Sequence, residues 1–296
     1  TTLTGGQQTP SKDQGINLLK LWKHECARVF EDKLTNLADK AWFHTCLADV
    51  TKAAFGDAQA AAVAEEQHFV DFFRDDVYDE EEVLIAEAPK VYESGGSLSA
   101  IRDRVEMYMG KHNTERPSTQ LHLVLFEDAL RHLLRISRII QMPRGSALLV
   151  GVGGSGKQSL TKLAAFIARH TLFQITLTKS YNVASLMEDL KTVFNLAGHL
   201  RKQVTFLFTD AEIKSEDFLE YINSVLMTGE VAGLFAKDEM LGMTGNLQPF
   251  FAKERPGVPE TQENLNRFFV DNARDNLHLV LCMSPVNPKF PVRARR

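Results

Sequence analysis

A glycine-rich turn followed by a lysine carries the clearest chemical meaning in the sequence. Residues 146–150 are mostly apolar, and residues 151–160 read Gly-Val-Gly-Gly-Ser-Gly-Lys-Gln-Ser-Leu. Glycines allow positive φ angles that point several N–H groups at one anion, and a following helix adds its positive N-terminal end. The pattern predicts a phosphate-binding loop in which Lys157 reaches the β- and γ-phosphates, the alternative being a glycine turn without a ligand. The predicted nucleotide-binding residues are Gly151, Gly153, Gly154, Ser155, Gly156, Lys157, Gln158 and Ser159.

Gln158 departs from this pattern, because the position after the lysine is normally Ser or Thr, whose hydroxyl binds Mg²⁺. Ser159 cannot simply substitute, since each step along a helix rotates the side chain by about 100°. An amide oxygen of Gln158 can still bind Mg²⁺ directly or through water. We therefore expect nucleotide binding to survive better than fast hydrolysis.

Two acids follow a second apolar run, Val204–Thr209. Asp210 is predicted to hold Mg²⁺, and Glu212 is predicted to orient the attacking water, as acids do at this point of nucleotide-hydrolysing sheets. Ala211 separates the two acids, and on an extended strand they would share one side. Asp210 fits either the metal position or the water position, with Thr209 standing in for the former. The alternative is a solvated pair of acids after a strand.

Ser284 follows a third apolar run, residues 277–283, and precedes Pro285. A residue just after such a strand can touch the γ-phosphate or the attacking water, so Ser284 is a third candidate catalytic residue. An ordinary strand exit before a proline explains the same pattern.

The elements that must position these residues alternate between strands and helices. This alternation predicts an α/β fold with a parallel sheet, helices on both faces, and the ligand at the carboxyl ends of the strands. The predicted elements are strand 146–150, helix 156–170, strand 173–178, helix 182–198, strand 204–209, helix 215–228, an irregular stretch 236–262, helix 261–275 and strand 277–283.

The preceding part of the chain has helical periodicity over residues 16–73. Helices are expected at 39–55 and at 58–74, the latter burying Phe69, Phe72 and Phe73. Two more are expected at 97–109 and 118–141. The acidic run 75–82 predicts loosely structured, solvated chain at a boundary, since like charges repel, and the alternative is a carboxylate metal cluster.

Composition limits the function classes. The 296 residues carry a net charge of −4 without a basic cluster, so nucleic acid is not an expected main partner. No apolar run approaches the ~20 residues that span a bilayer, so no membrane partner is expected either. Cys26, Cys46 and Cys282 lack metal-ligand spacing and are expected to be buried thiols in a reducing compartment. The absence of an initial Met suggests a fragment.

The sequence resembles an AAA+ P-loop NTPase module, and more closely a dynein heavy chain of the axonemal, outer-arm type. Residues 21–30, Leu-Trp-Lys-His-Glu-Cys-Ala-Arg-Val-Phe, look like the helical lid of the third module of that motor ring. The segments similar to the fourth module are 151–160, 173–177, 206–213, 218–223, 229–235 and 277–286.

The resemblance implies that residues 1–80 are the lid end of the preceding module with an acidic linker, and that residues 81–296 are a nucleotide-binding domain that ends before its own lid. It implies ATP or ADP binding with a regulatory or structural role, and it makes 236–262 an insertion facing a neighbouring module or a disordered surface loop. Gln158, Thr209-Asp210 and Ser284 depart from the family's usual residues, so slow or absent hydrolysis is expected. A competent ATPase is the alternative, and a P-loop kinase or transferase is a remote one.

The resemblance also implies partners and a location. The partners are neighbouring AAA+ modules of the same heavy chain, other dynein chains, and microtubules bound through parts absent from this sequence. The location is the cytoplasm and cytoskeleton, in the axoneme of a cilium or flagellum.

Overall fold

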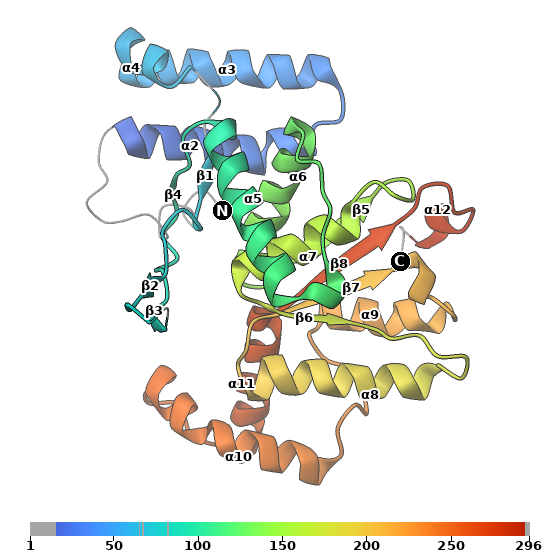
Figure 1. The fold of residues 1–296 in the computed structure, drawn as a ribbon. Helices are drawn as coiled ribbons and strands as arrows, with labels where there is room; N and C mark the ends of the chain where they lie inside the picture. Colours follow the sequence, from blue (N-terminus) through green and yellow to red (C-terminus); the bar gives the residue numbers. More distant parts are fainter. Residues whose placement is uncertain (1–15, 65, 67, 82, 294–296) are drawn as a thin grey trace. The chain divides into compact units, whose positions relative to one another are not determined.

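The computed structural model describes residues 16–64, 66, 68–81 and 83–293 (Figure 1). The described residues form two compact units, one within 16–110 and 125–130, the other within 111–124 and 131–293. These units are spatial groupings, and the predicted domain boundary at residues 80–81 stays a prediction. No helix in the described ranges is long and apolar enough to cross a membrane.

The first unit begins with helices and continues into two small antiparallel sheets. The asparagine before α3 caps it, since Asn36 Oδ1 accepts a hydrogen bond from the Asp39 N–H at 2.7 Å. Leu21, Phe69 and Tyr92 form a buried cluster. The elements are α2 (Ile16–Val29), η1 (Glu31–Lys33), α3 (Leu37–Phe55), α4 (Asp57–Ala62), and the strand pairs β1 (Phe69–Val70) with β4 (Glu93–Ser94) and β2 (Val77–Tyr78) with β3 (Leu84–Ala86).

Three expectations for this unit are wrong. The helix predicted at 58–74 ends at Ala62, because Phe69 pairs with Ser94, a partner too distant in sequence for periodicity to reveal. The acidic run forms the β2–β3 turn, where Asp79 Oδ1 accepts hydrogen bonds from the N–H groups of Glu81 and Val83 at 2.9 and 2.8 Å. Cys46 is exposed on α3, whereas Cys26 and Cys282 are buried as expected.

Two helices have residues in both units, α5 (Leu98–Glu115) and α6 (Glu127–Gln141). The helix predicted at 118–141 is α6, which begins nine residues later than expected, at Glu127. The Asn113 side chain explains part of this delay, since it donates to the Leu121 C=O at 2.8 Å and accepts from the Leu121 N–H at 2.7 Å. Those bonds hold the backbone out of a helix, after the short turn η2 (Pro117–Thr119).

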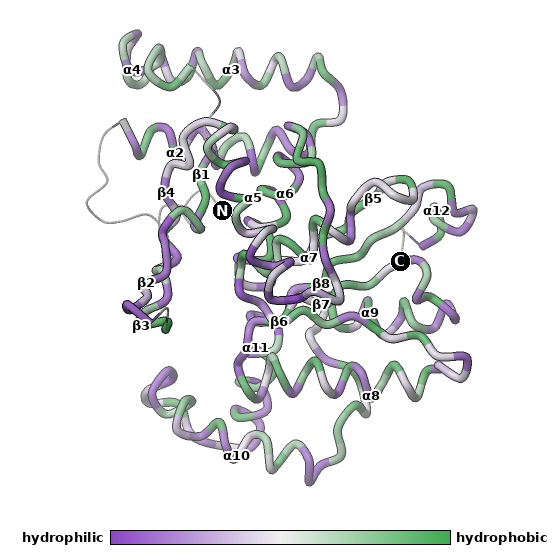
Figure 2. Tube along the Cα trace, in the orientation of Figure 1, coloured by the Kyte–Doolittle hydropathy of each residue, from purple (hydrophilic) through white to green (hydrophobic). Residues whose placement is uncertain are grey.

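The second unit contains the predicted parallel sheet, in the order β5-β8-β7-β6 (Figure 1). All six residues of β7 are buried, which is typical of a parallel strand covered on both faces. Along α8, apolar and polar residues alternate (Figure 2), and its apolar side is buried. The elements are β5 (Ala147–Val150), α7 (Lys157–Ala168), β6 (Thr171–Gln174), α8 (Val183–Phe194), η3 (Asn195–His199), β7 (Val204–Thr209), η4 (Asp210–Glu212), α9 (Asp217–Met227), α10 (Lys237–Glu254), α11 (Gln262–Asn276), β8 (Leu277–Met283) and α12 (Phe290–Arg293).

Tertiary packing overrides the sequence pattern at two places in this unit. The strand predicted at 173–178 is β6, which starts and ends earlier in register with β7. The helix predicted to reach residue 198 ends as α8 at Phe194 and continues as the π-helix η3. Gly198 of that turn lies against Phe269, where a Cβ would come within 2.8 Å of the ring.

The expectation of an irregular stretch at 236–262 is wrong, because residues 237–254 form α10. Two glycines and Pro249 disfavour a helix locally. Packing supplies the compensation, since Leu247 and Phe251 are buried and the Phe251 ring meets Phe268 of α11 edge to face at 5.4 Å. Glu239 also caps the first turn by accepting from the Ala236 N–H at 2.7 Å.

Candidate functional site

The glycine loop joins β5 to α7 in the strand–turn–helix context that its chemistry requires. Gly154 and Gly156 have φ angles of 77° and 78°, in the left-handed region that other residues rarely adopt. Gly156 is the residue that precedes α7, so the loop N–H groups and the helix N-terminus lie together. The Gly151 N–H donates to the Met283 C=O at 3.1 Å and ties the start of the loop to the end of β8.

The ammonium of Lys157 lies inside this loop. Its Nζ donates to the carbonyl oxygens of Gly151 at 2.6 Å and Val152 at 2.8 Å, and to Ser155 Oγ at 3.1 Å. These contacts hold one fixed positive charge beside the loop N–H groups. The arrangement is suited to a phosphate group, for which both the charge and the N–H donors are complementary.

A cavity of about 380 Å³ lies where this loop meets the carboxyl ends of β7 and β8. Its volume is in the range of small-ligand sites. The structure thus brings together the predicted loop residues 153–159, Asp210 and Ser284, whereas Gly151 and Glu212 are outside its wall. Thr209, the alternative residue for the metal position, also lines the cavity. Ala211, Cys282 and Met283 line it as well and were not assigned as site residues from the sequence.

Size alone does not select this cavity. Another one, of about 470 Å³, is lined by residues 228–235 and by parts of α9 and α11. Its wall contains Glu230, and none of its described lining residues is a lysine or arginine. A phosphate group would find no positive side chain there, so the loop cavity remains the nucleotide-site candidate.

Asp210 and Glu212 point in different directions, because residues 210–212 form the 3-10 turn η4 instead of an extended strand. The expectation that the two acids share one side is therefore wrong. Asp210 Oδ2 accepts a hydrogen bond from the Ser284 N–H at the edge of the cavity. Glu212 folds back into the protein, where its Oε2 accepts from the Thr209 N–H at 2.6 Å and its Oε1 accepts from Gln174 Nε2 at 3.1 Å.

Glu212 is buried, with only 4% of its surface exposed. Burial raises the pKa of its carboxyl, and the two hydrogen bonds oppose that shift. Burial likewise raises the pKa of the Cys282 thiol to about 11, so this cavity-lining cysteine is a neutral thiol at physiological pH.

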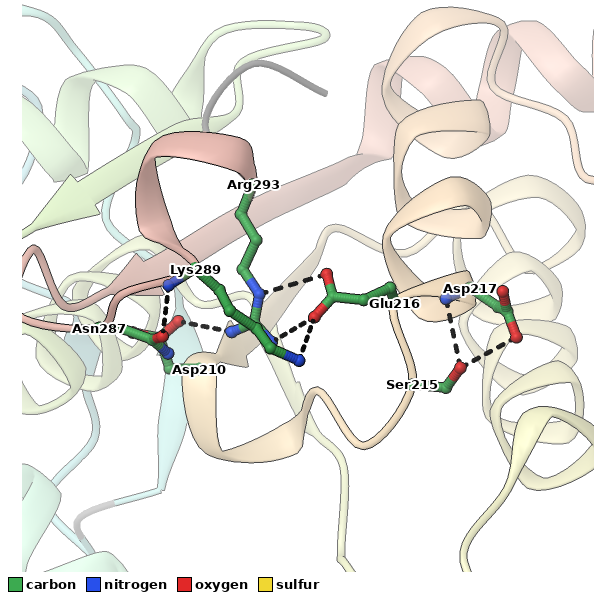
Figure 3. A network of polar contacts seen from close by, with 7 residues as sticks. All are labelled: Asp210, Ser215, Glu216, Asp217, Asn287, Lys289 and Arg293. Atoms are coloured by element: carbon green, nitrogen blue, oxygen red, sulfur yellow. Dashed lines mark hydrogen bonds and ion pairs between the residues drawn. The ribbon is translucent and has the colours of Figure 1, made fainter.

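Arg293 is a charged residue of this site that the sequence did not reveal. It lies on α12 with its side chain 6% exposed, and its Nη1 is 3.3 Å from Asp210 Oδ1. The same guanidinium contacts Glu216 with Nη2 at 2.8 Å and Nε at 3.4 Å (Figure 3). This hydrogen bonding lowers the pKa of Glu216 to about 2. The one sequence signal is an arginine nine residues after Ser284, which by itself points to no partner.

The residues fit a nucleotide better than they fit Mg²⁺. The loop N–H groups, the α7 N-terminus and Lys157 provide phosphate donors. The candidate protein ligands for Mg²⁺ are Gln158 and Asp210. The Gln158 side chain is exposed, and the two carboxylate oxygens of Asp210 already face the Ser284 N–H and the Arg293 guanidinium. Among the described residues, no group of three or more His, Cys, Asp or Glu side chains could hold a metal ion. The protein ligands offered to Mg²⁺ are thus an exposed amide and a carboxylate that already has two partners.

Comparison with known proteins identifies two matching family models. The model described as the P-loop containing dynein motor region D4 matches residues 121–296, and the AAA+ lid domain model matches residues 11–64.

Curated relatives match nearly the whole chain. It is 49% identical over 282 residues to Dynein axonemal heavy chain 5 of Mus musculus, and 46% identical over 280 residues to Dynein axonemal heavy chain 8 of Homo sapiens. It is 45% identical over 281 residues to the Dynein gamma chain, flagellar outer arm, of Chlamydomonas reinhardtii. Each alignment covers 94% of this chain and 6% of the relative, so the chain spans a small part of the length of these proteins.

Proposed function

The chain belongs to the dynein heavy chain family, and we propose that it is an AAA+ module of an axonemal dynein that binds ATP or ADP with a regulatory or structural role and slow or absent hydrolysis. The family and the AAA+ P-loop fold agree with the predictions made from the sequence. The role of the module and its hydrolytic competence go beyond the family assignment and rest on the geometry of the site.

The observation that carries the proposal is the single cavity that joins the glycine loop to the ends of β7 and β8. Gly154, Gly156 and the α7 N-terminus supply backbone donors for phosphates, and Lys157 supplies the positive charge. Ser284, at the end of β8, would lie on the phosphate side of a nucleotide bound in this cavity. These residues bind and orient a nucleotide without requiring that it be hydrolysed.

Slow or absent hydrolysis is supported by the position of the acids. A residue that orients or deprotonates water must reach the cavity. The two carboxylate oxygens of Glu212 instead accept hydrogen bonds from the Thr209 N–H and the Gln174 amide, inside the protein. Asp210 reaches the cavity edge, but its two oxygens face the Ser284 N–H and Arg293. Neither carboxylate is available to activate water in this arrangement.

A competent ATPase is the second candidate function. It is favoured by one observation, namely that Gln158, Asp210 and Ser284 line the same cavity as Lys157. When bound, Mg²⁺ would neutralise phosphate charge and stabilise the charge that develops during phosphoryl transfer. Gln158 and Asp210 would have to supply its protein ligands, and Asp210 would have to give up its present contacts.

The names of the relatives extend the proposal to location and partners. They are axonemal and flagellar outer-arm dyneins, and we infer that this chain works in the axoneme of a cilium or flagellum. Its nearest partners would be neighbouring AAA+ modules of the same heavy chain, with other dynein chains further away. Contact with microtubules would be made by other parts of the motor.

The test is fluorescent-nucleotide binding to the 296-residue chain, with phosphate release followed in the same samples. Lys157→Ala is expected to weaken ADP and ATP binding at least tenfold, because charged hydrogen bonds worth about 1.5–3 kcal/mol are lost. Lys253→Ala, which removes a charge from the exposed surface of α10, is the matched control and should bind like wild type. Equal binding by Lys157→Ala and wild type would contradict the proposed site, and rapid phosphate release lost in Asp210→Ala would favour the competent ATPase.

A further inference from the structure

The guanidinium of Arg293 is held next to Asp210 by a second acid. Its Nη2 and Nε atoms contact the two carboxylate oxygens of Glu216 at 2.8 and 3.4 Å, which is the fork geometry that arginine forms with carboxylates. Its Nη1 is then 3.3 Å from Asp210 Oδ1. Lys289 Nζ joins the cluster 3.2 Å from Glu216 Oε1 (Figure 3). Two cations thus face two carboxylates.

This placement brings a permanent positive charge to the carboxylate that was expected to hold Mg²⁺. Arginine stays protonated in proteins, and the Arg293 side chain is 6% exposed, so water screens its charge weakly. The other oxygen of Asp210 accepts the Ser284 N–H. A metal ion on Asp210 would have to displace these donors and would lie close to the guanidinium, which repels it.

We propose that Arg293 is the resident cation of this nucleotide site, so that the module holds a nucleotide without Mg²⁺. Arg293 neutralises Asp210, which would otherwise repel phosphates in the same cavity. Lys157 and the loop N–H groups then bind the phosphates in the absence of a metal. The inference rests on the proposed nucleotide-binding function and adds that its affinity is independent of divalent ions.

The experiment measures fluorescent ADP affinity of the 296-residue chain in EDTA and in excess Mg²⁺. For wild type, Mg²⁺ is expected to change the affinity less than threefold. Arg293→Gln leaves Asp210 as an uncompensated anion, so its affinity in EDTA should fall at least tenfold and Mg²⁺ should restore it. Arg293→Lys keeps a cation and should restore much of the metal-free affinity.

Lys289→Gln is the matched control, because it removes a cation that pairs with Glu216. It should retain the Mg²⁺-independent affinity of wild type. Electron paramagnetic resonance of Mn²⁺ gives a second readout that does not depend on turnover. Wild type is expected to release Mn²⁺ when it binds ADP, whereas Arg293→Gln should retain it. Circular dichroism checks that each variant is folded.

The wild-type measurement decides the inference even if Arg293→Gln does not fold. Binding that depends on Lys157 and tightens tenfold or more with Mg²⁺ would overturn the role of Arg293 and leave the proposed nucleotide-binding function intact. Loss of nucleotide binding in every condition would overturn both. An equal Mg²⁺ response of Arg293→Gln and Lys289→Gln would also contradict the inference.

Discussion

The carboxylate of Glu212 accepts a hydrogen bond from the backbone N–H of Thr209 at 2.6 Å, within a single tight turn. This contact separates two acids that have only Ala211 between them in the sequence. Asp210 faces the cavity at the end of β7, and Glu212 belongs to the buried structure that holds the turn. The chemical roles available to the two acids differ for that reason.

Glu212→Ala is expected to destabilise the fold without weakening nucleotide binding. The substitution leaves the buried N–H of Thr209 without its acceptor, which costs about 1–3 kcal/mol of unfolding free energy. Chemical denaturation measures the stability, and fluorescent-nucleotide titration at a temperature well below the melting point should give an affinity within threefold of wild type. A selective loss of phosphate release in a stable Glu212→Ala protein would instead assign Glu212 to catalysis.

Because Gly242 and Gly245 lie in the helix α10, replacing either of them with alanine is expected to stabilise the protein. A Cβ built at Gly242 or at Gly245 meets no atom within 4 Å, so alanine fits at both positions. Each change is expected to add about 0.5–1 kcal/mol to the free energy of unfolding, because alanine loses less conformational entropy in a helix. Gly198→Ala is the opposing control, since its Cβ would come within 2.8 Å of Phe269 and should destabilise. If residues 237–254 were irregular, neither glycine change would raise stability.

The three cysteines are expected to react at two distinct rates. Cys46 is exposed, whereas Cys26 and Cys282 are buried and burial raises the pKa of both thiols. A chromogenic thiol reagent at pH 8 should therefore modify Cys46 rapidly, and should modify the other two thiols only when the protein unfolds. Cys46→Ser should remove the rapid phase. Two rapid thiols in the native wild-type protein would contradict the burial of Cys26 or Cys282.

The Glu216–Arg293 contact predicts a pH-dependent contribution to stability. The pKa of Glu216 is lowered from its ordinary value of 4.5 to about 2, first by the hydrogen bond from Arg293. A carboxyl with a lower pKa in the folded state stabilises the protein above about pH 4.5 and loses that contribution as the pH falls toward 2.

Glu216→Gln should therefore lower the melting temperature at pH 7, with a difference from wild type that narrows below pH 4.5. Glu263→Gln, at a side chain that is 82% exposed, is the control and should give a smaller difference. A difference between Glu216→Gln and wild type that stays constant down to pH 3 would contradict the contribution of this ion pair.

Local sequence patterns, and their order along the chain, determined much of the fold and of the candidate site. Residues 146–160 specify a strand, a glycine turn and a helix through local rules, namely the apolar run, positive φ at Gly154 and Gly156, and the helix after Lys157. The alternation of apolar strands and helices specified a parallel sheet, and parallel strands collect their carboxyl ends at one edge. For these physical reasons Lys157, Asp210 and Ser284 could be assigned to one site from the sequence.

Only the tertiary structure decided features that depend on distant partners. The backbone of Thr209 and the amide of Gln174 turn Glu212 inward, and packing on α11 makes α10 helical despite its glycines and Pro249. The charge next to Asp210 comes from Arg293, 83 residues later, because β8 lies beside β7 and α12 folds back over its end. Local sequence patterns cannot predict such contacts, because these interactions form only after the fold has brought the distant partners together.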